Sequence, residues 1–361
     1  MGVRSARITD VPAIRSLARR GDAQALGLSP GVPAPAATPV AFLCAWQTFG
    51  FRYQTLVLRG VPARGFSQAR ARPGRESWDV LRLVCLAPDE ESYFQGCAEL
   101  LERICVATAQ RGALRTFVRV PSDSRLLPLV TGQGFRAYAS ELTLSGALAP
   151  LVSGAPGLQA DIRLRQPRDA WDIFSLYCAV TPALVRHAEG RSLREWSTPP
   201  PPPLPIWSRQ SRREVVMGEP GHLQAWMRWT SCAHHRTQLL DMLVRPEAAY
   251  RIGDLVRFAV ERLALDPTCA TICRTREYDG RVSATLEVAG FRPISHETLM
   301  VRHTVARVTE RQLLIAALRA QGLGIDVSQY RYDAEPAHQR LASSREAEQH
   351  HYDRQNRTCY Y

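Results

Sequence analysis

The chain has 361 residues, 45% of them hydrophobic, and a formal net charge of +12 that comes from 46 basic residues, all arginine. This length predicts two domains, and the hydrophobic content allows each to bury a core. No window approaches the ~18 uninterrupted apolar residues of a membrane span, and residues 1–6 do not form a hydrophobic signal segment. We therefore expect a cytoplasmic protein that does not associate with membranes.

The arginines are spread along the chain, and no basic run with interleaved aromatic residues forms a stripe for nucleic acid. Arginine in place of lysine throughout indicates a compositional bias, so we interpret the charge as a solvated basic surface and do not expect a nucleic-acid partner. The nine cysteines lack Cys-x-x-Cys spacing, and Cys44, Cys85, Cys105 and Cys178 have apolar neighbours. They predict buried thiols and no metal site.

Identical residues recur about 156 positions apart along the chain. The recurring pairs are Gly65/Gly221, Gln68/Gln224, Ala69/Ala225, Gly134/Gly290, Phe135/Phe291, Arg136/Arg292 and Glu141/Glu297. So regular a displacement predicts a tandem of two related domains. We place them at residues 1–146 and 161–304, joined by a linker at 147–160 that is rich in small residues.

Each copy begins with a short strand and a helix capped by aspartate. The strands are Val3–Ile8 and Ile162–Leu164, and the caps are Asp10 and Asp169. A proline-rich stretch follows in each copy, at 29–39 and 197–205, where proline excludes a helix or a central strand. We predict rigid surface loops there. A ligand for a proline-recognising partner is the alternative.

The remaining elements follow in the same order in both copies: a hairpin, an apolar strand, an amphipathic helix, another strand, and a last strand after a short helix. In the first copy these are residues 51–58 with 65–72, 78–86, 95–110, 115–120 and 137–144; in the second, 214–218 with 222–229, 237–244, 252–263, 270–274 and 294–302. This order predicts an α+β fold in which helices flank a mixed, mostly antiparallel sheet. A C-terminal helix is predicted within 305–327, and a disordered tail over 328–361.

This order of elements resembles the GNAT superfamily of N-acetyltransferases, over both copies. The resemblance is carried by the opening strand and capped helix, the Gly-x-x-Gln-Ala strand, the apolar strand that ends at Pro88 or Pro246, and the terminal Gly-Phe. It implies two tandem GNAT-like domains that use acetyl-CoA as co-substrate. In that family the fourth strand splays away from the fifth to expose backbone groups to the pantetheine arm. A glycine-containing loop then places amide groups at a helix N-terminus around the pyrophosphate.

The resemblance assigns acyl-CoA binding to the end of the apolar strand and to the turn after it. The implied residues are Val84, Cys85, Leu86, Tyr93, Gly96, Cys97 and Ala98 in the first copy, and Leu243, Val244 and Gly253 in the second. Acidic residues precede the first turn, and Asp254 follows Gly253, so both turns depart from the family pattern. We favour binding in the first copy. The alternative for both glycines is that they only permit a tight turn.

Catalysis in this family needs a base for the amine and often a tyrosine that protonates the leaving thiolate. Val130 and Leu286 stand at the tyrosine's usual position and cannot donate a proton. As substitutes we predict Tyr138, with Tyr93 as the alternative, for the acid of the first copy, and Glu76 and Asp79 for its base. In the second copy the predicted bases are His234, His235 and Asp241.

The sequence thus predicts an acyl-CoA-dependent N-acyltransferase that transfers an acetyl group to a small-molecule or peptide amine. One copy, preferentially the first, would be active and the other structural. Two alternatives stay open: a catalytically inactive tandem module that binds or regulates, and a relative that interacts with RNA or aminoacyl-tRNA. The acceptor and the oligomeric state cannot be predicted from these residues.

Overall fold

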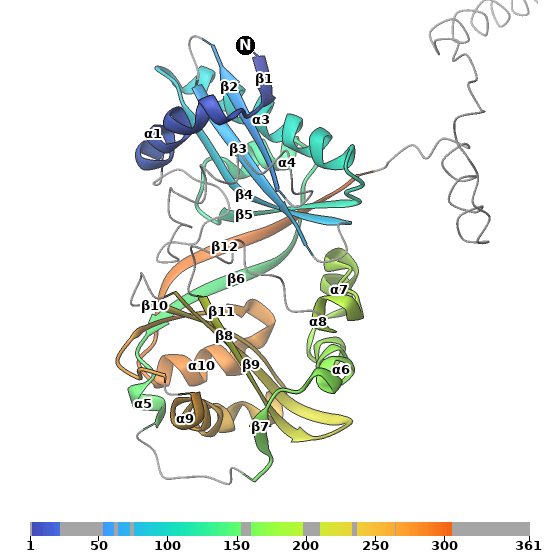
Figure 1. The fold of residues 1–361 in the computed structure, drawn as a ribbon, viewed down its shortest axis with the longest axis vertical. Coiled ribbons are helices and arrows are strands. Elements are labelled where there is room, and N and C mark those ends of the chain that lie inside the picture. The colour runs from blue at the N-terminus through green and yellow to red at the C-terminus, as the bar shows by residue number, and fades with distance from the viewer. Residues whose placement is uncertain are drawn as a thin grey trace, which may run out of the picture. The chain divides into compact units, whose positions relative to one another are not determined.

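The computed structural model describes residues 2–21, 53–60, 64–72, 76–152, 160–197, 210–232, 237–263 and 265–304. All of them lie in the first of two compact units, Met1–Ala306, and Figure 1 draws them as coloured ribbon. Several predictions lie outside the described residues: the helix within 305–327, the tail, Cys44, the stretch 29–39, all but the first residue of 197–205, and His234 with His235.

The described elements follow the predicted order. In the first half they are β1 (Gly2–Ser5), η1 (Ile8–Asp10), α1 (Val11–Gly21), β2 (Tyr53–Arg59), β3 (Arg64–Ala71), β4 (Ser77–Leu86), α3 (Glu90–Ala109), β5 (Arg115–Pro121), α4 (Leu127–Gly132) and β6 (Arg136–Gly146). A short helix, α5 (Ala149–Val152), lies within the predicted linker.

The second half repeats the series. Its elements are β7 (Ile162–Leu164), η4 (Pro167–Asp169), α6 (Ala170–Val180), α7 (Ala183–Glu189), α8 (Leu193–Ser197), β8 (Gln210–Glu219), β9 (His222–Cys232), β10 (Thr237–Val244), η5 (Pro246–Arg251), α9 (Ile252–Leu263), β11 (Ala270–Arg276), η6 (Glu277–Asp279), α10 (Gly280–Val288) and β12 (Arg292–His303). None of the described helices is long and apolar enough to cross a membrane.

The described strands form one 12-stranded sheet in the order β1-β2-β3-β4-β5-β12-β6-β11-β10-β9-β8-β7. Two neighbouring pairs, β4 with β5 and β10 with β11, are parallel, and the others are antiparallel. The predicted α+β fold with a mixed, mostly antiparallel sheet is confirmed. The sheet, however, is continuous through both halves.

The last strands of the two halves are exchanged (Figure 1). β12 of the second half pairs with β5 of the first, from Pro121 opposite Glu297 to Arg115 opposite His303. β6 of the first half pairs with β11 of the second, and β6 and β12 pair with each other. The exchange also joins the cores, because Met300 of β12 packs in the core of the first half and Leu144 of β6 in that of the second.

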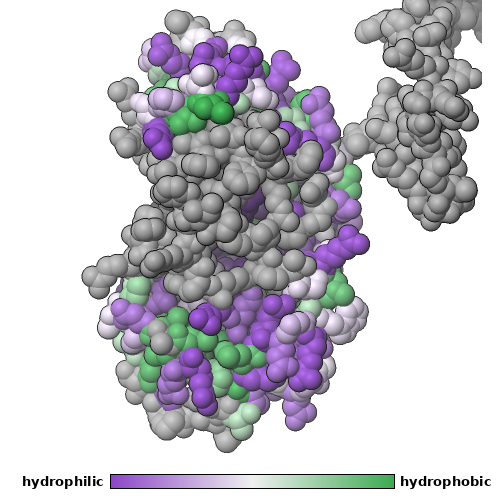
Figure 2. Space-filling model, in the orientation of Figure 1, coloured by the Kyte–Doolittle hydropathy of each residue, from purple (hydrophilic) through white to green (hydrophobic). Residues whose placement is uncertain are grey.

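Each half buries its main core between one face of the sheet and its long helix. In the first half Trp78 of β4 packs in one core with Leu100 of α3, and in the second Trp229 of β9 packs in one core with Leu255 of α9. Smaller apolar clusters lie on the opposite face, under α1 and under α6 with α8. On the side drawn in Figure 2, hydrophilic side chains cover most of the described surface, with smaller hydrophobic groups among them.

The two predicted aspartate caps make the same local structure. Asp10 is buried, accepts the backbone N–H of Arg7 at 2.8 Å, and binds the Arg4 guanidinium at 2.8 and 2.9 Å. Asp169 binds Arg163 in the same bidentate way at 2.7 and 2.8 Å. The Arg4 hydrogen bond lowers the pKa of Asp10 to about 2, against the opposing effect of burial. Both carboxylates therefore hold the strand and turn that precede the first helix of each half. Asp169 is the N-cap residue of α6 but makes no side-chain cap hydrogen bond to it, so the predicted capping by this side chain is wrong.

The recurring glycines Gly65 and Gly221 serve different physical needs. A Cβ on Gly65 would lie 2.9 Å from Leu100 Cδ1 and nearer still to the Val84 carbonyl oxygen, so only glycine allows α3 and β4 to approach. Gly221 has φ of +85° in the turn between β8 and β9, with no atom near its missing Cβ. Glycine is favoured at this position because the backbone is left-handed, which other residues rarely adopt.

Candidate active site

In each half the fourth strand leaves the fifth partway along its length. β4 pairs with β5 only from Ser77 opposite Arg115 to Asp79 opposite Phe117, although β4 continues to Leu86. β10 pairs with β11 only as far as Leu240 opposite Cys273. Beyond these points one edge of β4 and one edge of β10 have no ladder partner among the described strands. Such an edge can hydrogen-bond an extended ligand.

The strand residues expected to bind acyl-CoA lie beyond these divergences. Val84 and Cys85 are buried on β4 with Leu86 after them, while Leu243 and Val244 end β10. Because the Val84 and Cys85 side chains are buried in the cores, a ligand at this edge would meet backbone groups. Their assignment to acyl-CoA stays a prediction, now with an open strand edge beside it.

The predicted pyrophosphate turn of the first half is helix. α3 begins at Glu90 with Asp89 as its N-cap, so the expected start at Gln95 is wrong. The remaining assigned residues Tyr93, Gly96, Cys97 and Ala98 lie within this helix. The Asp89 carboxylate accepts the Ser92 N–H at 2.8 Å, and Glu90 and Glu91 occupy the first turn. Carboxylates thus stand where an anion would bind, and this helix end does not fit a diphosphate.

The corresponding helix end of the second half is covered by the segment between the halves. A Cβ on Gly253 would lie 3.1 Å from the carbonyl oxygen of Leu151 in α5. Beside it Arg251 binds Asp161 through two hydrogen bonds of 2.7 and 2.8 Å. Close packing of α5 therefore accounts for this glycine, and the N-terminus of α9 does not fit a diphosphate either.

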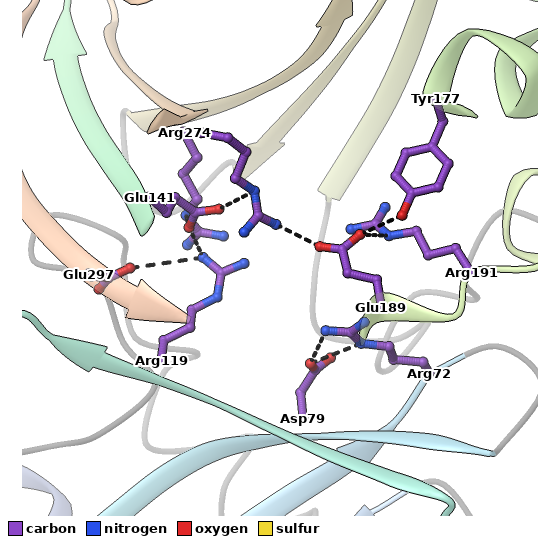
Figure 3. Close-up of polar contacts among 10 residues, drawn as sticks. Arg72, Asp79, Arg119, Glu141, Tyr177, Glu189, Arg191, Arg274 and Glu297 are labelled. Atoms are coloured by element: carbon purple, nitrogen blue, oxygen red, sulfur yellow. Dashed lines mark hydrogen bonds and ion pairs between the residues drawn. The ribbon is translucent and has the colours of Figure 1, made fainter. Parts of the chain in front are cut away.

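A network of ion pairs crosses the sheet between the two divergences (Figure 3). We call it the seam; it comprises Arg72, Asp79, Arg119, Glu141, Glu189, Arg191, Arg274, Arg276 and Glu297. It lies on the face that carries α7, because Ala188 packs against Phe117 and Tyr138 there. Both halves contribute charges to it.

Glu141 holds the middle of the seam with a side chain that is only 3% exposed. It binds Arg119 and lies 3.3 Å from Arg276 Nε and 3.9 Å from Arg274 Nε. Its repeat partner Glu297 stands directly opposite in the ladder between β6 and β12. Burial alone would raise the pKa of Glu141, but these guanidinium charges outweigh burial and leave the pKa below its usual value.

Glu189, at the end of α7, is a second buried anion of the seam. It accepts a hydrogen bond of 2.9 Å from the Tyr177 hydroxyl, and it binds Arg276 at 3.1 Å and Arg191 at 2.8 Å. Burial opposes ionisation, yet Arg191, Arg276 and Arg72 lower the pKa of Glu189 to about 2. A carboxylate held in this way is a poor proton acceptor near neutral pH.

The predicted bases are held in ion pairs or lie away from the divergence. Asp79 binds Arg72 at 2.7 and 2.9 Å, and Arg72 outweighs burial to lower the pKa of Asp79. Asp241 is paired with Arg228 in the same manner, and its pKa falls to about 2 against the effect of burial. Glu76 is exposed before β4 begins, where its carbonyl caps β5. The ion pairs weigh against Asp79 and Asp241 as general bases, and the role of all three residues stays a prediction.

Tyr138 is the predicted acid, and the structure brings it to the first divergence. Its ring lies 5.9 Å from that of Phe117, which is the last β5 residue paired with β4. Burial raises the pKa of Tyr138 and Glu189 adds to the rise, while nearby arginines oppose it. The phenol therefore stays protonated at neutral pH and can donate a proton.

Glu195 of α8 is a candidate base that the sequence did not suggest. No guanidinium is paired with its side chain among the described residues, although a backbone hydrogen bond from Ser192 and the charges of Arg191 and Arg72 act on it. Burial raises its pKa above the usual carboxyl value despite those arginines. No sequence motif surrounds this residue. It is identified in the structure because two arginines of the seam, Arg191 and Arg72, act on it.

Comparison with known proteins bears on the fold. No family model and no curated protein matches the sequence. A tandem GNAT protein from the clavulanic acid biosynthesis pathway is similar in structure, with a TM-score of 0.52 and 12% identity over 84% of this chain and 98% of its own. A GCN5-related N-acetyltransferase from Sphaerobacter thermophilus gives 0.51 and 14% over 84% and 95%. The chain thus has the fold of tandem GNAT proteins.

Proposed function

We propose that this chain is an N-acyltransferase that transfers an acyl group, acetyl in the first instance, from acyl-CoA to an amine at the divergence of the first half. One observation carries the proposal: the edge of β4 opens after Asp79, and the Tyr138 phenol lies at the same place. The second half is the structural copy, because α5 covers the N-terminus of α9.

The two parts of acyl-CoA fit this site unequally. The open edge of β4 suits the amide groups of the pantetheine arm. The first turn of α3 does not suit the diphosphate, because Asp89 already accepts a first-turn N–H and two glutamates follow it. Recognition therefore rests on the arm and the thioester, and the nucleotide lies outside the reach of the α3 dipole.

The transfer needs one proton acceptor and one proton donor. Glu195 removes a proton from the attacking amine, since it is the carboxylate beside Arg191 and Arg72 that is paired with neither guanidinium, and burial raises its pKa above the ordinary value. The nitrogen bonds to the thioester carbon as the carbon–sulfur bond breaks. Tyr138 gives a proton to the departing sulfur and is reprotonated by the one proton that Glu195 took from the amine. The products are an amide and a free thiol.

The test is calorimetric titration with acetyl-CoA, followed by a thiol-release assay with a panel of amines. We expect the unaltered protein to bind acetyl-CoA. Tyr138→Phe and Glu195→Gln should keep that binding and lower kcat by roughly 10²- to 10⁴-fold. Tyr250→Phe serves as the control, because Tyr250 is an exposed tyrosine of the second half. It should change neither the affinity for acetyl-CoA nor kcat. No binding of acetyl-CoA by the unaltered protein would refute the proposal.

A second candidate is a catalytically inactive tandem module that binds a ligand. It is favoured by Val130 and Leu286, which occupy the usual tyrosine position as fully buried core residues of α4 and α10. The same assays separate the two candidates. Acetyl-CoA binding without thiol release from any amine, unaffected by Tyr138→Phe, would favour the inactive module.

An RNA partner receives less support from the structure. The seam arginines are directed at carboxylates inside the protein, so they do not form a surface that contacts phosphates.

A further inference from the structure

We infer that the seam is the acceptor subsite and that it takes an amine which also carries a carboxylate, an amino acid being the simplest case. The inference rests on the proposed function, because it names the acceptor class of that same site. The subsite is composite. Arg72, which follows β3, lies with residues of β4, β5 and β6 of the first half on one side, and residues of α7, α8, β11 and β12 of the second half lie on the other.

Contacts between the halves fix the second wall over the first. Ala188 of α7 packs against Phe117 and Tyr138. Gly190, which ends α7, lies against Arg115 of β5, since a Cβ there would be 2.9 Å from Arg115 Nη2. The residues after Gly190 lead into α8 and Glu195, so α8 is tied to the divergence of the first half.

Two guanidinium groups of the seam each keep one N–H group unused. Arg72 engages Asp79 through Nε and Nη2, and Arg276 engages Glu141 through Nε and Glu189 through Nη2. The Nη1 atom of each is buried and has no hydrogen-bond partner among the described residues. The Arg72 guanidinium lies 3.8 Å from the centroid of the Phe117 ring, and that ring lies 5.9 Å from the Tyr138 ring. Both arginines also act electrostatically on Tyr138. A carboxylate would supply the missing acceptors.

The charge of the subsite favours a zwitterion over a phosphate or another net anion. Together with Glu195 the seam has equal numbers of guanidinium and carboxylate groups: Arg72, Arg119, Arg191, Arg274 and Arg276 against Asp79, Glu141, Glu189, Glu195 and Glu297. An amino acid adds no net charge to this balance. Its carboxylate would face the two Nη1 atoms, and its ammonium would face Glu195, the one carboxylate here without a guanidinium bound to it.

The experiment measures binding without any acyl donor. Each proteinogenic L-amino acid is titrated against the full chain by calorimetry, alongside its carboxamide, which keeps the amine and side chain but lacks the negative charge. We expect at least one amino acid to bind about tenfold or more tightly than its carboxamide, as a charge-assisted hydrogen bond predicts. Arg72→Lys keeps a cation beside Asp79 but removes Nη1, and it should abolish this preference.

Arg228→Lys is the matched control, because Arg228 binds Asp241 in the second half through the same two guanidinium atoms. It should retain the preference. If Arg72→Lys does not fold, as judged by circular dichroism, Arg276→Lys takes its place.

The inference is overturned if no amino acid binds, if amino acid and carboxamide bind equally, or if Arg228→Lys loses the preference as fully as Arg72→Lys. The acetyl-CoA titration is independent of these results. Amino-acid binding without acetyl-CoA binding would refute the proposed function and support the subsite, and the reverse result would overturn only the subsite.

Discussion

Glu141→Gln tests whether the seam holds the two halves together. The substitution keeps the shape of the side chain and leaves Arg119, Arg274 and Arg276 around a neutral group. Removing one partner from a buried ion pair costs ~3–5 kcal/mol. The three arginine side chains are between 14% and 30% exposed, so water screens part of their repulsion. We expect a loss of ~2–4 kcal/mol in the free energy of unfolding, and a fall in Tm of ~4–8 °C for a unit of this size.

Urea unfolding and calorimetry measure this loss, with Glu102→Gln as the matched control. Glu102 of α3 also binds an arginine of the other half, Arg302, at 2.6 Å, but its side chain is 44% exposed. A pair so exposed contributes ~0–1 kcal/mol. If Glu141→Gln destabilises the protein no more than Glu102→Gln does, the seam is not a structural anchor and the reasoning fails.

The same substitution has a defined pH dependence. The folded-state pKa of Glu141 lies below its ordinary value of 4.5, so the folded protein binds fewer protons here than the unfolded chain. The stability that this carboxylate contributes is complete above pH 4.5 and is lost as the pH falls toward the folded-state pKa. The difference in urea midpoint between the unaltered protein and Glu141→Gln should therefore shrink on acidification. A difference that stays constant down to acid pH would contradict this.

Three further substitutions test the N-terminus of α3 and the repeated glycines. Asp89→Asn keeps the helix cap and removes a charge from the N-terminus of α3. Because the proposed site keeps the nucleotide away from this helix end, the affinity for acetyl-CoA should stay unchanged in calorimetry, and tighter binding by about twofold or more would instead put the diphosphate beside α3. Gly65→Ala should lower the free energy of unfolding by more than ~2 kcal/mol, because its Cβ meets backbone, whereas Gly221→Ala should cost ~1 kcal/mol for its left-handed backbone. Thermal unfolding that ranks the two in the opposite order would refute this assignment.

The order of elements could be predicted because its signals are local. Apolar periodicity placed β10 and α9 at the bounds they have in the structure, 237–244 and 252–263. The start of α3 was missed because its apolar periodicity is clear only from Cys97 onward, although Asp89 and the acidic first turn are typical of a helix N-terminus. Gly96, which was expected in a phosphate-binding loop, therefore lies inside the helix, and its role in acyl-CoA binding stays a prediction.

The seam could not be predicted, although its centre repeats in the sequence. Glu141 and Glu297 recur at the repeat displacement, but a recurring glutamate on a strand is as easily a solvated residue. Their arginine partners are a few among 46 basic residues, and nothing local distinguishes them. The strand exchange is equally hidden, because β6 and β12 have related sequences and either could cover β5. Only the pairing across halves brings these charges together.

The exchange predicts how the first half behaves by itself. In residues 1–152 alone, β5 would lose its partner along Arg115–Pro121, β6 would lose both neighbours, and Met300 would be missing from the core. An uncovered central edge of this length is a template for pairing with another chain. Two copies can repair each other if β6 of one takes the place of β12 on the other, because β6 and β12 already pair antiparallel with Glu141 opposite Glu297. We therefore expect a symmetric dimer by light scattering and sedimentation. A folded monomer would contradict this. It would show that β6 can pair with β5 of the same half, so that each half can fold without exchanging its last strand.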